Sequence, residues 1–185
     1  MELFGSTTSP FVRHCRIALE QAQIPYELKL IDYDTSAKES PLQKMPYLKD
    51  GKVFLTDSSS ILMHIRKKQG QAFPASVEDF ELYTMVNTLA DTAVNLFLME
   101  KDGITPEKSD YLKRQQARLK TGFETLNAMI KTTEVLSSDG IIRAACLLDW
   151  ILFRNRYDLS SYGQLISLVS HAAGNELFIK TDPRA

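Results

Sequence analysis

Strand-forming patterns are confined to the first 55 residues of this chain, and this one-sided distribution limits the folds open to it. Short apolar runs at residues 1–5, 26–31 and 53–55 are bounded by Gly, Pro, Asp and Ser residues, which is typical of β-strands. Beyond residue 70 the apolar residues recur only at helical spacing. The chain is therefore expected to fold as an α/β part followed by an all-helical part.

The first part has the order of elements of a thioredoxin-like domain. A strand, a helix and a strand within the first 31 residues indicate a βαβ unit, whose crossover is right-handed. Two apolar runs around Asp50-Gly51 then predict a hairpin, which is followed by a helix over residues 61–69. We expect this domain at residues 1–70, a linker at residues 71–75, and a ligand site in the crevice between the two domains.

The second part, residues 76–185, is predicted to be all-helical. Helical stripes of apolar residues run from the cap at Ser76 to the stop at Gly103 and over residues 112–130, 141–153 and 162–173. The third of these helices is nearly continuous in apolar residues, so it is expected to be the central, buried one. The tail after residue 174 has too little pattern for an element to be assigned.

Composition argues against several classes of function. The net charge of −1 gives no electrostatic footprint for nucleic acid or for an anionic membrane, so neither is expected as a partner. Two cysteines without a C-x-x-C pair suit a reducing compartment, and three scattered histidines predict no metal site. No apolar run approaches the ~18 residues that a membrane helix needs, and the N-terminus has no signal-peptide pattern. A cytoplasmic protein is therefore expected.

The start of the first helix carries the clearest chemistry in the sequence. Ser9 is a good N-cap by type, and Pro10 suits the first helical position because its φ is fixed and its missing N–H would be unpaired there anyway. Free N–H groups and the positive end of the helix dipole favour an anion at this point. A helix N-terminus with a donor hydroxyl lowers the pKa of a thiol, so a thiolate would be stabilised here. The ordinary alternative is that Ser9 only caps the backbone.

Three motifs, in this order and spacing, resemble the glutathione transferase family, and the likeness extends over nearly the whole chain. The first is Ser9-Pro10-Phe11-Val12-Arg13, which is similar to the serine-type active-site start of theta-, zeta- and many bacterial-type members. The second is Lys44-Met45-Pro46-Tyr47-Leu48, and the third is an acidic-Ser element at residues 55–61. The resemblance implies a glutathione transferase with a thioredoxin-like domain and a helical domain, acting in detoxification as a homodimer.

The resemblance also implies how each motif would hold glutathione. Pro46 is expected to follow a cis peptide bond, which turns the backbone N–H and C=O of Met45 toward the cysteinyl part of the ligand. Asp57 would pair with the α-ammonium group, while Ser58 and the N–H groups at its helix start would bind the α-carboxylate. Lys44 would meet the glycyl carboxylate. Taken singly, Pro46 also fits a trans turn proline, Asp57 a plain N-cap and Lys44 a solvated side chain.

The implied mechanism depends on Ser9, which donates a hydrogen bond to the thiolate sulfur before this adds to a small apolar electrophile. Neighbouring Thr8 is a weaker candidate for the same role. Arg13 either biases the local field or is a solvated helix residue, and the second is favoured because the dipole effect fades within the first turn. The candidates for an electrophile pocket are three aromatic residues, Phe11, Tyr83 and Phe97. An apolar stripe at helical spacing is more often core than pocket.

Departures from the family pattern leave two other functions open. Relatives often start the third helix of the second domain with Ser/Thr-x-x-Asp, whereas this chain has Gly140-Ile141-Ile142-Arg143, or a cap at Asp139.

A transferase-like adaptor that has lost turnover is one alternative, and retention of the ligand motifs argues against it. A glutathione-dependent isomerase of the zeta type is the other, and the Ser-Ser-Cys run of that class is absent here.

Overall fold

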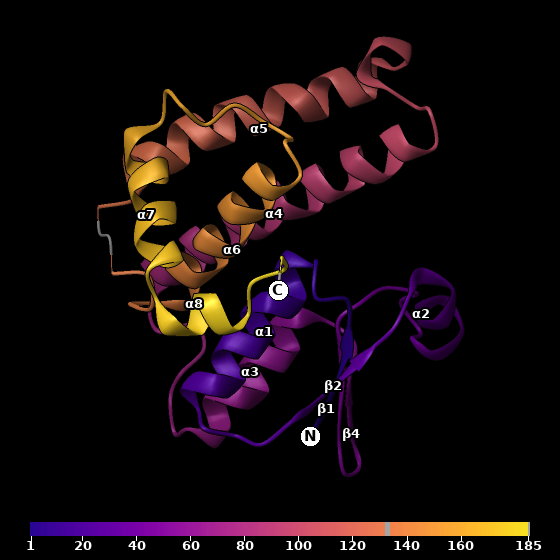
Figure 1. Cartoon of the computed structure of the whole chain (residues 1–185), viewed down its shortest axis with the longest axis vertical. Helices are drawn as coiled ribbons and strands as arrows, with labels where there is room; N and C mark the ends of the chain where they lie inside the picture. The colour runs from indigo at the N-terminus through magenta and orange to yellow at the C-terminus, as the bar shows by residue number, and fades with distance from the viewer. Residues whose placement is uncertain (132–133, 185) are drawn as a thin grey trace. The chain divides into compact units, whose positions relative to one another are not determined.

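The computed structural model describes residues 1–131 and 134–184, and the chain separates into two compact units. The first unit consists of Met1–Ser76 together with Ala173–Ala185, and the second of Val77–Ala172. Figure 1 shows both units and labels most of their elements. The predicted fold class, a thioredoxin-like sheet domain followed by a helical domain, is confirmed.

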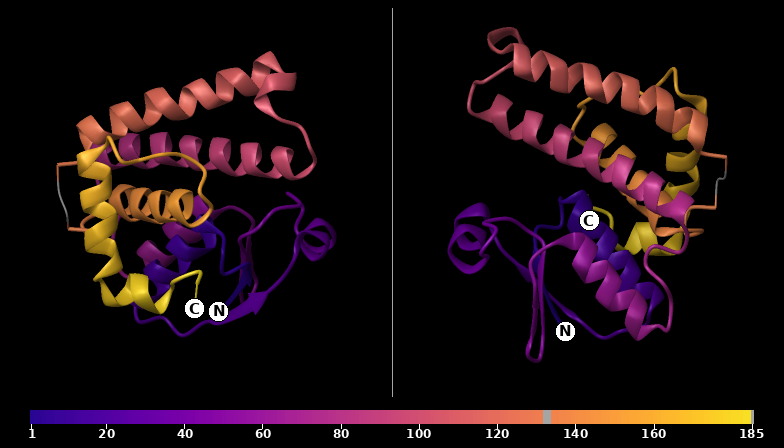
Figure 2. Two further views of the ribbon diagram at one scale, coloured as in Figure 1. Left: turned by 45° about the horizontal axis from the view of Figure 1, so that its top comes forward. Right: turned by 180° about the vertical axis from the view of Figure 1, so that it is seen from behind.

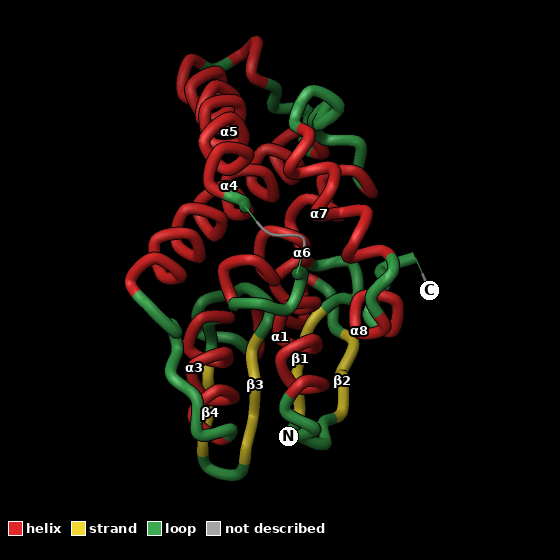
Figure 3. The backbone as a smooth tube through the Cα atoms, turned by 90° about the vertical axis from the view of Figure 1, so that its left-hand side faces the viewer, coloured by secondary structure: helices red, strands yellow, loops and turns green. Residues whose placement is uncertain are grey.

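A four-stranded mixed sheet forms the centre of the first unit. Its strands are β1 (Glu2–Gly5), β2 (Glu27–Leu30), β3 (Tyr47–Asp50) and β4 (Val53–Leu55). Their order across the sheet is β2-β1-β3-β4, with β1 parallel to β2, and β3 antiparallel to both β1 and β4 (Figure 3). The sequence predicts both motifs of this sheet. One is the parallel pair β1 and β2 with a helix between them, and the other is the β3–β4 hairpin.

Helices α1 (Pro10–Gln21) and α3 (Ser58–Lys68) pack against each other on one face of this sheet (Figure 1). Each turns an apolar stripe inward, and the fully buried members of the two stripes include Val12, Ile17, Leu19, Ile61, Leu62 and Ile65. A shorter helix, α2 (Tyr33–Glu39), is capped by the Asp32 side chain. The packing of α1 against α3 fixes the directions in which their two N-termini point.

The last residues of the chain group with the first unit, whereas the prediction assigned all of residues 76–185 to the helical domain. Helix α8 (Glu176–Lys180) is capped by Asn175 and packs against α1. Arg16 of α1 donates hydrogen bonds to the carbonyl oxygens of Lys180 and Thr181, at 3.2 and 3.3 Å. These partners are 164 and 165 residues apart in sequence, so no local pattern predicts the contact.

All elements described in the second unit are helices. They are α4 (Val77–Lys101), the 3₁₀ turn η1 (Pro106–Lys108), α5 (Asp110–Met129), α6 (Asp139–Phe153) and α7 (Gly163–Ala173). The two longest helices, α4 and α5, lie side by side (Figure 2), and α4 also packs against α6. Twelve of the fifteen residues of α6 are buried, which confirms the prediction of a central buried helix.

The N-terminus of α6 is capped differently from the prediction. Ser138 is the N-cap, and its Oγ accepts a hydrogen bond from the Ile141 N–H at 3.3 Å. Neither Gly140 nor Asp139 is therefore the cap. The Gly140 N–H donates instead to Oδ1 of Asp79 in α4, at 2.8 Å. The helix start thus has Asp139 in its own first turn and a second acidic group, Asp79, from another helix 61 residues away in sequence.

Three further features concern membranes, metals and thiols. No helix in the described part of the chain is both long and apolar enough to cross a membrane. Within residues 1–131 and 134–184, no three His, Cys, Asp or Glu side chains are grouped so that they would hold a metal ion. Cys15 and Cys146 are both buried within helices.

Candidate functional site

The topology of the sheet brings the three predicted motifs to one end of the first unit. Leu48 of β3 is paired with Leu3 of β1 and with Leu55 of β4, and β3 is antiparallel to both strands. The end of β1, the start of β3 and the end of β4 therefore lie side by side. The motif segments that adjoin these strand ends are residues 6–9, 45–46 and 56–58. Segments that are far apart in sequence are thus neighbours in the fold.

Ser9 caps α1 as a hydrogen-bond acceptor, so its O–H group can donate to another acceptor. Its Oγ accepts a hydrogen bond from the Val12 N–H at 3.4 Å, and its carbonyl oxygen accepts one from the Arg13 N–H at 3.0 Å. A hydroxyl has one donor and two acceptor sites, so this cap leaves the Ser9 O–H able to donate. The Thr8 hydroxyl is instead hydrogen-bonded to the Ser6 hydroxyl, with 3.0 Å between the oxygens. Ser9 is therefore a cap, as predicted, and its O–H can still donate to a ligand.

The Met45–Pro46 peptide bond is cis, as the resemblance implied. The next residue, Tyr47, begins β3 and pairs with Phe4 of β1. Their two rings are stacked with centroids 4.5 Å apart, and the buried Tyr47 hydroxyl donates to Glu39 at 2.7 Å. The position of Met45 is therefore set by a well-packed strand that begins two residues later.

Asp57 caps α3 and forms an ion pair with Lys44. Its Oδ1 accepts from the Ser59 N–H at 2.8 Å, and its Oδ2 lies 2.8 Å from the Lys44 Nζ. Burial by itself would raise the pKa of the Asp57 carboxyl, but hydrogen bonds from Lys44 and the Ser59 N–H outweigh burial and lower this pKa below its ordinary value. The side chains of Lys44 and Asp57 are 50% and 41% exposed, so a ligand can reach both charges. Ser58, the first residue of α3, is buried beside them.

The arrangement offers partners for charges of both signs within a small area. The N-termini of α1 and α3 begin at the same end of the sheet, and each favours an anionic group. The Asp57 carboxylate suits an ammonium group, and the Lys44 ammonium suits a carboxylate. A zwitterionic amino-acid group therefore finds complementary partners at α3, and a sulfur anion finds a hydroxyl donor at Ser9.

The aromatic residues predicted for an electrophile pocket have different surroundings. Phe11 lies in the first turn of α1 and is partly exposed. Tyr83 is 2% exposed, and its hydroxyl accepts a hydrogen bond from Arg143 at 2.7 Å. Phe97 packs edge-on against Trp150, with ring centroids 5.7 Å apart. Tyr83 and Phe97 are fourteen residues, or about 21 Å, apart along α4, and Tyr83 packs in the core, which is evidence against a shared pocket.

The prediction that Arg13 is a solvated helix residue is wrong, because its side chain is only 5% exposed. Its Nη2 donates to the Phe178 carbonyl oxygen at 2.8 Å, and its Nε donates to the Thr181 hydroxyl at 3.3 Å. These acceptors lie 165 and 168 residues further along, in a tail without a clear sequence pattern. No signal near Arg13 in the sequence identifies such partners.

Comparison with known proteins supports a family assignment for the first unit. Residues 3–73 match the family model of the glutathione S-transferase N-terminal domain. Glutathione S-transferase theta-1 of Bos taurus is 36% identical over 75 residues, which cover 37% of this chain and 31% of that protein. Glutathione S-transferase 3 of Schizosaccharomyces pombe is 40% identical over 67 residues, which cover 33% of this chain and 28% of that protein. The chain thus spans about a third of the length of these curated relatives.

Solved structures extend the likeness to the whole chain. A glutathione S-transferase from Methylobacillus flagellatus with GSH bound is 20% identical with a TM-score of 0.84, covering 97% of this chain and 98% of that one. A glutathione S-transferase from Methylobacterium radiotolerans, in complex with glutathione sulfonate, is 20% identical with a TM-score of 0.82, covering 100% of this chain and 95% of that one. Residues 3–73 therefore match the glutathione S-transferase N-terminal domain, and the chain as a whole has the fold of these solved glutathione S-transferase structures.

Proposed function

We propose that this protein is a glutathione transferase, an enzyme that binds glutathione and adds its thiolate to a small apolar electrophile. The observation that carries the proposal is the gathering of Ser9, Met45-Pro46 and Asp57 at one end of a glutathione S-transferase N-terminal domain. Two structures of the same fold hold GSH and glutathione sulfonate. The proposal includes a cytoplasmic homodimer that acts in detoxification, as the sequence resemblance implies.

In this proposal the γ-glutamyl end of glutathione binds at the start of α3. Its α-ammonium group pairs with Asp57, and its α-carboxylate is bound by the Ser58 hydroxyl and the N–H groups of the first turn. The backbone of Met45, before Pro46, pairs with the cysteinyl part, and Lys44 moves from Asp57 to the glycyl carboxylate. An exposed ion pair such as Lys44–Asp57 contributes little to stability, so its exchange for ligand contacts has a small cost.

Ser9 is proposed to act on the sulfur of bound glutathione. The thiol loses its proton to solvent, and the Ser9 hydroxyl and the dipole of α1 stabilise the thiolate that remains. The sulfur then forms a bond to the electrophilic carbon, and the bond from this carbon to the leaving group breaks with its electron pair, as chloride in the case of a chlorodinitrobenzene-type electrophile. Phe11 is the proposed apolar contact for the electrophile. Tyr83 and Phe97 are weaker candidates for this contact, because Tyr83 is buried in the core and the Phe97 ring packs against Trp150.

Calorimetric titration with glutathione tests the binding site. The wild type is expected to bind, and Ser58→Ala and Asp57→Asn are each expected to bind about 10- to 100-fold more weakly. Each substitution removes a hydrogen bond to a charged group, worth about 1.5–3 kcal/mol. Asparagine caps a helix as well as aspartate does, so Asp57→Asn removes the charge and keeps the cap.

Asp50→Asn is the matched control for the loss of a carboxylate. Asp50 lies at the other end of β3, where its Oδ2 is 2.8 Å from His64 and 3.0 Å from Lys68. This variant is expected to bind glutathione with wild-type affinity. An absence of binding by the wild type would reject the proposed function. An equal loss of affinity in Asp50→Asn would show that the titration reports stability and not the site.

Measurement of glutathione during turnover separates the transferase from the two alternatives. A solved structure of maleyl pyruvate isomerase, described as a zeta-class bacterial transferase, is 17% identical with a TM-score of 0.77. A transferase consumes one glutathione for each electrophile, whereas an isomerase returns its glutathione unchanged. A glutathione concentration that stays constant while the substrate is converted would therefore favour the isomerase, and an adaptor would convert nothing.

A further inference from the structure

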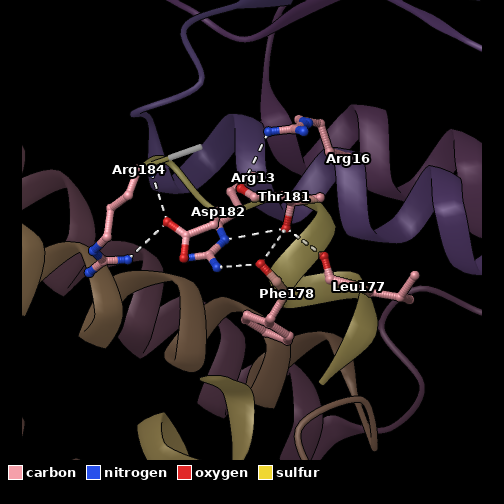
Figure 4. A network of polar contacts seen from close by, with 7 residues as sticks. All are labelled: Arg13, Arg16, Leu177, Phe178, Thr181, Asp182 and Arg184. Carbon is pink, nitrogen blue, oxygen red and sulfur yellow. Dashed lines mark hydrogen bonds and ion pairs between the residues drawn. The ribbon is translucent and has the colours of Figure 1, made fainter. Parts of the chain in front are cut away.

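Residues 178–182 enclose the side chain of Arg13, which projects from the first part of α1 (Figure 4). The Phe178 carbonyl oxygen and the Thr181 hydroxyl accept hydrogen bonds from Nη2 and Nε, at 2.8 and 3.3 Å. The carbon at the centre of the guanidinium group also lies 5.2 Å from the centroid of the Phe178 ring. Arg13 is thus held from several directions by one short segment.

The charge of Arg13 is complemented within the same segment. The Asp182 carboxylate accepts hydrogen bonds from the Arg184 N–H at 2.7 Å and from its Nη1 at 3.1 Å. Burial by itself would raise the pKa of Asp182, but these hydrogen bonds and the charges of Arg184 and Arg13 lower it. Asp182 therefore stays ionised near Arg13. The segment thus gives this guanidinium group two neutral hydrogen-bond acceptors and a nearby negative charge.

Arg13 also shares a hydrogen-bonded turn with Ser9. The Arg13 N–H donates to the Ser9 carbonyl oxygen at 3.0 Å, and the Val12 N–H donates to the Ser9 Oγ at 3.4 Å. One helical turn closed by such bonds is a compact ring, so its two ends move together. An anchor on the Arg13 side chain is therefore an anchor for Ser9.

We propose that Arg13 is a positioning residue, which holds the first turn of α1 against residues 178–182 and so sets the direction of the Ser9 hydroxyl. This inference rests on the proposed role of Ser9 toward the glutathione sulfur. The hydrogen bond to the sulfur weakens when the hydroxyl is displaced, so the anchor favours the thiolate. Arginine suits this role because the donors of its planar guanidinium fork point in fixed directions, whereas the three donors of a lysine ammonium group rotate freely.

Two variants test the anchor in the full-length protein. Arg13→Lys keeps the charge and loses the fork, and Thr181→Val removes one acceptor while the shape of the side chain stays nearly the same. The thiolate absorbance of enzyme-bound glutathione is measured against pH for each. We expect the midpoint to rise by about one pH unit, which is a tenfold smaller thiolate fraction below the midpoint. The kcat should fall about tenfold and the glutathione Kd should be unchanged, because the Asp57 end of the site is intact.

Lys180→Gln is the matched control from the same segment. Lys180 pairs with Glu20 at 2.6 Å, and its side chain is 61% exposed. This variant should keep the wild-type midpoint and kcat. Thermal unfolding of every variant shows whether it is folded, and Thr181→Val carries the test if Arg13→Lys does not fold. If Arg13→Lys or Thr181→Val is folded and has the wild-type pH midpoint of the thiolate, the inference about Arg13 is overturned and the proposed function is not affected. A wild type that binds no glutathione would overturn the proposed function together with the inference.

Discussion

At the scale of single residues, Ser9 shows how a common helix cap acquires a second use. The oxygen accepts the Val12 N–H at 3.4 Å, which any capping serine does. The cap does not use the O–H donor of the same hydroxyl group, so this donor is available to a ligand. Capping and the proposed sulfur contact therefore use different parts of one hydroxyl group and do not compete.

Replacement of Ser9 by alanine separates the two uses. Ser9→Ala is expected to lower the free energy of unfolding by about 1 kcal/mol, because the cap is lost. It should also lower kcat by about 100-fold, the usual cost of one lost donor to a developing anion. Chemical denaturation and a conjugation assay with a chlorodinitrobenzene-type electrophile measure the two effects.

Ser109→Ala is the control for the cap alone. Ser109 caps α5 with the same geometry, since its Oγ accepts the Leu112 N–H at 3.4 Å. This variant should lose about the same stability as Ser9→Ala and keep full activity. Full activity in Ser9→Ala would refute the serine mechanism and leave Thr8 as the donor to be tested.

At the scale of elements, the start of α6 is capped by two helices together. Ser138 satisfies one N–H of its own helix, and Asp79 of α4 satisfies the Gly140 N–H. A Cβ at Gly140 would lie 2.8 Å from the Asp79 Oδ1 and 2.9 Å from the Leu82 Cγ. Glycine is therefore required at this position by the close approach of α4, and not by its backbone conformation.

Gly140→Ala is expected to lower the free energy of unfolding by about 1–3 kcal/mol, because α4 and α6 must move apart. The control is Gly163→Ala at the start of α7, where a Cβ would have no neighbour within 4 Å. That change should be neutral or stabilise by up to about 1 kcal/mol, since alanine restricts the unfolded chain. Denaturant unfolding of the two variants measures this difference. Equal midpoints would contradict the explanation that α4 approaches Gly140 too closely for a side chain.

At the scale of the whole molecule, the chain returns to its first unit after the helical unit is complete. Helix α8 has only five residues and no stability of its own as an isolated helix. Its contacts with Arg13 and Arg16 therefore hold it in place, and it in turn shields a buried cation. The first unit is thus built from both ends of the sequence.

Two truncations test this dependence. A chain that ends at residue 174 loses both acceptors of the Arg13 side chain, and its free energy of unfolding should fall by about 3 kcal/mol. A chain that ends at residue 182 keeps these acceptors and should remain close to wild-type stability. Thermal and denaturant unfolding compare the two, and an equal effect would contradict a specific role for residues 178–182.

The sequence by itself determined most of the elements and the cap of α1, although the cap of α6 and helix α8 were not among them. Strand alternation, helical stripes and the Ser9-Pro10 start depend on residues within about one turn of each other, so they are visible in a linear pattern. The order of these elements also predicts the thioredoxin-like sheet, because short connections and right-handed crossovers leave few topologies. The glutathione motifs were recognised for the same reason, since each is a short local segment.

Only the tertiary structure decided which distant groups meet. The burial of Arg13 depends on acceptors more than 160 residues away, and the acceptor of the Gly140 N–H at the start of α6 is Asp79 in α4. The pairing of Lys44 with Asp57 likewise depends on the antiparallel register of β3 and β4. The physical reason is that a buried charge or N–H takes whichever partner the packing brings near, and sequence distance has no part in that choice.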